Sequence, residues 1–346
     1  MKVSYPQIGD YDVAIKYLLR NILKEDELIC APKITNKTKE LGGKNSPDFV
    51  CAPFKYTLGT MIETLDMGAN LILQFGGGCR YGYYHELQRK ILQDLGYDFK
   101  LINLISGSRK ININKLLKEY KINKFKFYYH LLITIRIVKC MDDIDDYIRL
   151  NLCYETEKGS FNKLRKVMLK DLENTKGLLD IEKKYRKYKK KFRKLKKEKK
   201  DVIKIGIVGE LYTLMEPNAN YNIEEELMNM GCSIKRFTNV SYLLFKKSKA
   251  VKRYLKKIFI KYRMGADALD NIYYTKYLCE NDYDGIIHMK SSFCTPEISA
   301  MPIINKVANE YKVPVIFFSM DLNSSETGIK TRLEAFYDML QMRRNK

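Results

Sequence analysis

Residues 70–96 read NLILQFGGGCRYGYYHELQRKILQDLG and predict a strand, a glycine-rich loop and a helix in direct succession. The run at 70–75 is short and apolar, which is typical of a buried strand. The apolar spacing of 82–96 is that of an amphipathic helix. Because Cys79 and Arg80 lie between them, the loop is expected either to cradle a phosphate or to present a thiolate.

The glycines of this loop do not match a nucleotide-binding signature. Gly76, Gly77, Gly78 and Gly82 form neither G-x-G-x-x-G nor the P-loop, which requires G-K-[ST]. Glycines also let the backbone approach a bulky group closely. The thiolate interpretation is therefore favoured, and Gly77, Gly78 and Arg80 are predicted to contact a cofactor.

The same alternation of short apolar runs and helical segments occurs on both sides of a long helical region. Strands are predicted at 27–30, 48–51, 70–75, 98–104, 202–210, 232–237, 283–290 and 313–321. Strands that alternate with helices favour parallel sheets. We therefore expect an α/β protein with two Rossmann-like lobes: an N-terminal α/β lobe at 1–105, a helical linker or insertion at 106–200, and a C-terminal α/β lobe at 201–346.

The net charge of +22 comes largely from one segment. Residues 183–200, KKYRKYKKKFRKLKKEKK, contain 13 basic residues and one acid. Apolar residues recur in and before this run at helical spacing, at Ile181, Tyr185, Tyr188, Phe192 and Leu195, which predicts a basic amphipathic helix. A solvated helix face is the main interpretation. Attraction to an acidic partner is an alternative, and nucleic-acid binding is not expected, because the aromatic residues recur on one helical face.

No run of about 18 apolar residues is present, so no membrane span is expected. The N-terminal stretch lacks the pattern of a signal peptide. A cytoplasmic location is therefore predicted, where the eight cysteines would not form disulfides. No C-x2-C pair occurs, so a metal site would have to combine distant parts of the chain.

Three cysteines occupy similar positions. Cys51, Cys79 and Cys294 each follow a predicted strand and precede a predicted helix. Ligands of open α/β sheets bind beyond the carboxyl ends of the strands, and a helix start favours the thiolate form. Cys30 also ends a predicted strand, and it is either a core residue or a fourth ligand. The remaining cysteines are predicted to be core residues: Cys140, Cys153, Cys232 and Cys279.

Several blocks resemble the 2-hydroxyacyl-CoA dehydratase D-component superfamily, most closely the acyl-CoA dehydratase activase-related (CoA-substrate-specific activase) proteins. The blocks are SPDFVCAPFKYTLGTMIETLDMGANLILQFGGGCRYGYYHELQRKILQDLGYDF, GELYTLMEPNANYNIEEELMNMG, DYDGIIHMKSSFCTPEISAMP and VPVIFFSMDLNSSETGIKTRLEAFYDML. They cover about half of the chain in the same order as in the family. The segment 106–200 is similar only in being helical.

The resemblance implies an oxygen-sensitive iron–sulfur cluster in the cleft between the lobes. Its three ligands would be Cys51 of C-x-P-F-K, Cys79 of G-G-G-C-R and Cys294 of C-x-P-E. The cluster would be a [4Fe–4S] centre or a double-cubane [8Fe–9S] centre with an open iron position. An ATP-dependent iron–sulfur activase would supply low-potential electrons for the reduction of a substrate under anaerobic conditions.

Other polar residues are candidates for roles around the cluster. Glu210, at the end of a predicted strand, is the candidate catalytic residue. Lys55, Arg80, Glu297 and the cluster 324–327 could donate or accept hydrogen bonds there, although surface or capping roles are also expected. His85 and His288 are predicted to be structural.

The sequence also departs from the dehydratase subunits. Their substrate-binding elements before the first lobe cannot be matched in residues 1–25. A generic ATP-driven reductase, or a homodimer or heterodimer with a homologous subunit, is compatible with the pattern. Two alternatives stay open: a non-catalytic accessory or scaffold subunit that docks the activase or a larger partner, and a zinc site on the same three thiols.

Overall fold

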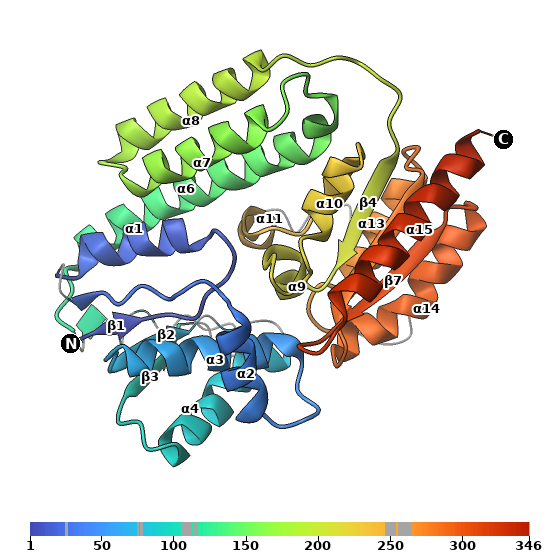
Figure 1. Cartoon of the computed structure of the whole chain (residues 1–346). Coiled ribbons are helices and arrows are strands. Elements are labelled where there is room, and N and C mark those ends of the chain that lie inside the picture. The colour runs from blue at the N-terminus through green and yellow to red at the C-terminus, as the bar shows by residue number, and fades with distance from the viewer. Residues whose placement is uncertain are drawn as a thin grey trace. The chain divides into compact units, whose positions relative to one another are not determined.

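The computed structural model describes residues 1–24, 27–74, 76, 79–104, 113, 117, 118, 120–245, 254 and 264–345. The chain is an α/β protein with two parallel sheets (Figure 1), which confirms the predicted fold class. One sheet has the strand order β1-β2-β3, and the other has the order β5-β4-β6-β7.

The chain divides into two compact units, each with one of the sheets. The first unit comprises Met1–Ile137 and Asp171–Ile181, and the second comprises Val138–Lys170 and Glu182–Lys346. The helical region is thus shared between the units. The proposed boundaries after residues 105 and 200 remain a prediction.

The sheet of the first unit consists of β1 (Val3–Ser4), β2 (Leu71–Gln74) and β3 (Lys100–Asn103), all parallel. Its helices are α1 (Asp12–Ile22), α2 (Asn36–Lys44), α3 (Ala52–Asp66), the 3-10 turn η2 (Arg80–Tyr83) and α4 (Tyr84–Asp94). Apolar side chains of α3 and α4 pack with Ile72, and those of α1 pack with Leu71 and Leu73. Both faces of the sheet are therefore covered.

Two of the predicted strands of this unit are wrong. Residues 48–51 form a turn in which Phe49 is 80% exposed, and only Val50 and Cys51 pack against the core. In the run at 27–30, Leu28 makes only an isolated bridge to Val3. The strand that completes the sheet is instead β1, which is too short to give a periodic signal.

Helices α2 and α3 cross with their backbones in contact. A Cβ atom on Gly59 would lie 2.0 Å from the carbonyl oxygen of Thr38, and one on Gly42 would lie 1.9 Å from that of Lys55. The side chains also interact, since the Thr38 hydroxyl donates to Glu63 at 2.6 Å. Only glycine permits this crossing, which fixes the helix that begins after Cys51.

Replacing Gly59 with alanine is expected to lower the free energy of unfolding by about 1–3 kcal/mol, because backbone atoms must separate to admit the methyl group. Gly328→Ala is the matched control, since its Cβ atom would meet only ordinary contacts at 3.5 Å in a helix. That variant should be neutral or more stable. Urea unfolding measures both, and equal stabilities of the two variants would contradict the argument.

The sheet of the second unit contains β4 (Lys204–Gly209), β5 (Ser233–Arg236), β6 (Gly285–Ser291) and β7 (Val315–Met320), all parallel. Its helices include α9 (Leu211–Met215), α10 (Ile223–Asn229), α11 (Val240–Phe245), α13 (Ala268–Cys279), α14 (Thr295–Glu310) and α15 (Glu326–Arg344). All four strands predicted in this region are present with bounds that differ by one or two residues from the prediction.

Helices cover both faces of this sheet. Side chains of α10 and α15 pack with Ile205, Ile287 and Met289, whereas those of α13 pack with Val208 and Ile286. Every residue of β6 is buried. The carboxyl ends of β4 and β6 therefore emerge side by side from a fully enclosed sheet.

The helical region contains α6 (Lys124–Asn151), the short turn η3 (Leu152–Tyr154), α7 (Ser160–Glu173) and α8 (Leu178–Lys194). On α8, Ile181, Tyr188 and Phe192 are buried, whereas most of the lysines and arginines between them are exposed. Phe192 packs against Phe161 of α7, with ring centroids 6.0 Å apart. The aromatic side chains of the basic segment thus serve mainly to pack the helix.

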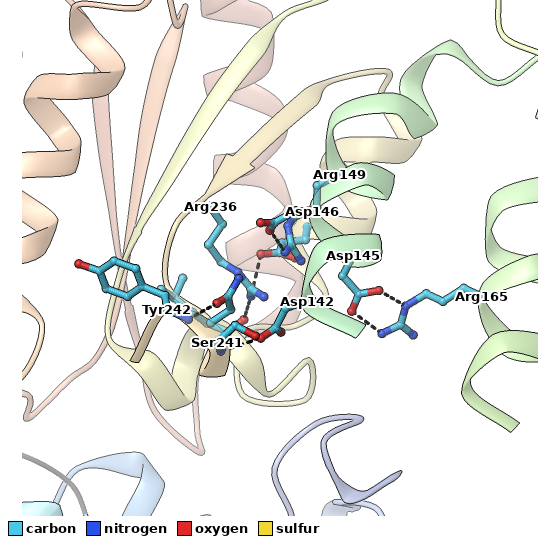
Figure 2. A network of polar contacts seen from close by, with 11 residues as sticks. Asp142, Asp145, Asp146, Arg149, Arg165, Arg236, Ser241 and Tyr242 are labelled. Carbon is cyan, nitrogen blue, oxygen red and sulfur yellow. Dashed lines mark hydrogen bonds and ion pairs between the residues drawn. The ribbon is translucent and has the colours of Figure 1, made fainter. Parts of the chain in front are cut away.

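Charged side chains join α6 to the sheet of the second unit (Figure 2). Arg149 of α6 pairs with Asp146 and, at 3.3 Å, with Glu224 of α10, which also pairs at 2.9 Å with Arg236 of β5. Asp142 of α6 accepts a hydrogen bond of 2.7 Å from the amide of Ser241. These contacts fix the carboxyl-terminal half of α6 within the second unit.

Across the described residues, no helix is long and apolar enough to traverse a bilayer.

Candidate functional site

Cys51 occupies the N-cap position of α3. Its backbone is extended, with φ −69° and ψ 151°, and Pro53 stands in the first turn of the helix. The amide of Phe54 donates a 2.9 Å hydrogen bond to the Cys51 carbonyl oxygen. The half-buried thiol contacts the hydroxyl of Tyr84 on α4. The sulfur is therefore held at the start of a buried helix.

Cys79 occupies the N-cap position of η2, which leads directly into α4. Asn103 of β3 holds this turn, because its side-chain amide donates to the Gly82 carbonyl at 3.2 Å and lies 3.0 Å from His85 Nδ1. Arg80 is exposed. Gly77 and Gly78, the predicted cofactor contacts, lie outside the described residues.

Cys294 occupies the N-cap position of α14, three residues after β6 ends. Its amide donates to the Ser291 carbonyl at 3.0 Å, and its own carbonyl accepts from the Ile298 amide at 3.0 Å. Pro296 stands in the first turn of the helix, and Cys294 itself is 9% exposed. The strand end and the helix start thus fix this cysteine in the second unit.

The three predicted ligands share one local geometry. None of the three thiols forms a side-chain capping bond to its helix. The other five cysteines, all within the described residues, do not occupy such a position. Burial raises the pKa of Cys140 and Cys232 to about 12 and that of Cys153 and Cys279 to about 11, as expected for core thiols.

Thiols in such positions suit iron, zinc or an iron–sulfur cluster as soft donors. Cys51 and Cys79 belong to the first unit and Cys294 to the second. No group of three or more metal-ligating side chains is assembled within the described part of the chain. The donor set therefore fits a thiolate-ligated centre chemically, and its assembly is part of the proposal below.

Glu210 caps α9, a role that the sequence did not reveal. One carboxylate oxygen accepts from the Tyr212 amide at 2.8 Å, and the other accepts from the amide and hydroxyl of Thr213 at 2.9 and 2.6 Å. Burial raises the pKa of this carboxyl; the hydrogen bonds from Thr213 and Tyr212 act in the opposite direction, and Glu297 adds to the increase. A catalytic role for Glu210 remains a prediction.

A buried hydrogen-bond network holds the first turn of α14, the helix that Cys294 precedes. Glu297, in the first turn of α14, accepts hydrogen bonds from His288 Nε2 at 2.8 Å and from the Asn271 side chain at 3.0 Å. Asn271 of α13 also donates to the carbonyl oxygen of Gly209 at 3.0 Å. The network links the turn after β4 to the helix that follows Cys294.

Lys290 is the functional candidate that the sequence argument missed. It lies in β6, is 4% exposed, and directs its ammonium group to the carbonyl oxygens of Ser291 and Ser292 at 3.4 and 3.3 Å. A lysine near the end of the otherwise apolar stretch GIIHM was the available signal. Asn271 gave no such signal, because a single asparagine in a helix is common.

Most of the remaining candidates have local structural roles. Ser325 caps α15 by accepting from the Gly328 amide, and Ser324 accepts from the Asp321 amide at 2.8 Å. Lys55 lies on α3 and is half-buried. Ser324 and Ser325 thus have the capping roles expected for them, whereas a role for Lys55 remains a prediction.

Residues 148–340 match the family model of the 2-hydroxyglutaryl-CoA dehydratase D-component. The match covers more than half of the chain, so the protein belongs to this family. The family is generally associated with iron–sulfur clusters. No curated protein matches the chain. The matched segment contains Glu210, Lys290 and Cys294, whereas Cys51 and Cys79 precede it.

Proposed function

We propose that this protein is an iron–sulfur component of the 2-hydroxyacyl-CoA dehydratase type, with Cys51, Cys79 and Cys294 as the cluster ligands. The observation that carries the proposal is their common N-cap position without a side-chain capping bond. The proposal requires the two units to bring the three thiols together. The cofactor would be a [4Fe–4S] or double-cubane cluster, and the protein would work in the cytoplasm.

The local geometry favours such ligands for an electrostatic reason. The first amides of a helix lack intrahelical acceptors and carry partial positive charge, which stabilises an adjacent thiolate. The enclosed β6–α14 turn also limits the access of water to Cys294. When bound, the cluster would supply low-potential one-electron reduction at its open iron position. Glu210 would lie near substrate, and Gly77, Gly78 and Arg80 would border the cluster.

An ATP-dependent iron–sulfur activase would be the electron donor, and a homologous subunit would complete a homodimer or heterodimer.

The second candidate function is an accessory subunit that docks the activase or a larger dehydratase. One observation favours it: Cys51 and Cys79 fall outside the matched family segment. Turnover of a hydroxyacyl-CoA with activase, ATP and reductant would support the first function. Turnover that requires an added partner subunit and persists with Cys79→Ser in this chain would support the second.

The decisive experiment is iron and acid-labile sulfide analysis of anaerobically prepared protein, with EPR of the reduced form. We expect about four irons per chain for a single cubane, or about eight for a double cubane. Cys79→Ser should lose most of the iron and the EPR signal, because the cluster loses a thiolate. Cys279→Ser, which changes a core thiol, should retain both. Zinc in place of iron, or equal iron in the two variants, would refute the proposal.

A further inference from the structure

Lys290 is a cation inside the second unit. It stands in β6 between β4 and β7, pairs in register with Ser319, and belongs to a strand in which every residue is buried. Only 4% of the residue is exposed. A buried ammonium group is costly unless a carboxylate or several good acceptors compensate for its lost hydration.

The compensation that Lys290 receives is small. Among the described residues, its three N–H donors have two acceptors, both carbonyl oxygens at the long end of the hydrogen-bond range, 3.4 and 3.3 Å. No carboxylate of the described residues lies within ion-pair distance of it. The group is therefore half-satisfied in the protein alone.

The nearby acid, Glu297, is held by other partners. One of its oxygens accepts from Asn271, and the other accepts from Asn271 and His288. Burial lowers the pKa of Lys290, while the thiol of Cys294 and the carboxyl of Glu297 act in the opposite direction. The Lys290 ammonium group and the Cys294 amide both donate to the Ser291 carbonyl oxygen, at 3.4 and 3.0 Å, so the charge lies beside the turn that carries Cys294.

We propose that Lys290, together with the first amides of α14, forms an anion-binding site around Cys294, and that its occupant is the anionic thiolate-ligated centre. This inference rests on the proposed function. Lys290 would be a positioning residue that supplies the counter-charge. The Asn271–Glu297–His288 network would hold Glu297 away, so that the positive charge stays available to the centre.

The inference has two consequences of opposite sign. In the empty protein, the half-satisfied ammonium group destabilises the fold, so a methionine of similar length should be tolerated or preferred. In the loaded protein, the same charge attracts the anionic centre and favours its reduced form, which carries one more negative charge. A lysine with a merely structural role would stabilise both forms.

The test compares wild type, Lys290→Met and the exposed control Lys306→Met, all as full-length chains. Without iron, Lys290→Met should unfold at the same temperature as wild type or at a higher one. After anaerobic reconstitution, it should lose iron to a chelator roughly tenfold faster. Its cluster should also have a lower midpoint potential in an EPR-monitored redox titration. Lys306→Met should behave as wild type in all three measurements.

A lower unfolding temperature of the iron-free Lys290→Met protein would overturn the inference, and so would unchanged iron retention. Wild-type protein that binds no iron would overturn the proposed function and this inference together. Normal iron in the wild type with an unaffected Lys290→Met variant would overturn the role of Lys290 alone.

Discussion

Replacing Gly209 with alanine is expected to destabilise the second unit by more than about 3 kcal/mol. Gly209 ends β4 with φ +146°, a backbone conformation that residues with a Cβ atom rarely adopt. A Cβ atom there would lie 1.8 Å from the carbonyl oxygen of Met289 on the neighbouring strand β6. The backbone cannot yield easily, because the Glu210 amide donates to that same oxygen at 2.9 Å.

The control for this substitution is Gly231→Ala. Gly231 also has a positive φ, +86°, but its Cβ atom would meet nothing within 4 Å. Gly231→Ala should therefore lower the free energy of unfolding by about 1–2 kcal/mol, because only the backbone conformation is strained. Urea unfolding followed by circular dichroism measures both variants. Equal midpoints for the two would show that the β4–β6 contact is not the cause.

Replacing Arg149 with leucine is expected to lower the free energy of unfolding by about 3–5 kcal/mol, because two carboxylates lose a buried partner. Arg149 is 4% exposed and pairs with Asp146 (Figure 2) and with Glu224. Burial alone would lower its pKa, but Glu224, Asp146 and Asp145 raise it above the usual value. The side chain is therefore charged, and its removal leaves Asp146 without this cation and, among the described residues, Glu224 with Arg236 alone.

Arg165→Leu is the matched control for Arg149→Leu. Its ion pair with Asp145, at 2.7 Å, is a quarter exposed at the arginine side chain. Solvent screens such a pair, so the loss should be about 1 kcal/mol. The free energies of unfolding at low ionic strength check the comparison. An Arg149→Leu variant no less stable than Arg165→Leu would contradict the view that burial decides the effect.

The second sheet could be predicted from the sequence because β4, β6 and β7 lie in mainly apolar runs bounded by turns, although β5 contains only one apolar residue, Ile234. The spacing of Ile329, Leu333, Phe336 and Leu340 likewise indicates a helix, and α15 buries these four side chains. The first sheet was harder to predict from the sequence. Residues 48–51 look like a strand but form a turn, and the two-residue β1 depends on pairing with β2, which no local pattern reveals.

Part of the candidate site could also be predicted. The N-cap positions of Cys51 and Cys294 follow from local sequence, since each precedes a proline that suits a first helical turn. Residues that act through tertiary contacts could not be found in this way. The Asn271–Glu297 bond joins α13 to α14, and the isolation of Lys290 from carboxylates depends on which partners Glu297 already has.

The crossing of α2 and α3 bears on how distant relatives could be recognised. The backbones touch at Gly42 of α2 and Gly59 of α3, which leaves no space for a side chain at these two positions. Cys51 stands at the start of α3. Homologues with the same α2–α3 crossing would have to keep both glycines at this spacing, and a cysteine between them would mark those that share the proposed ligand. That triplet is a search pattern for the part of the chain that precedes the family match.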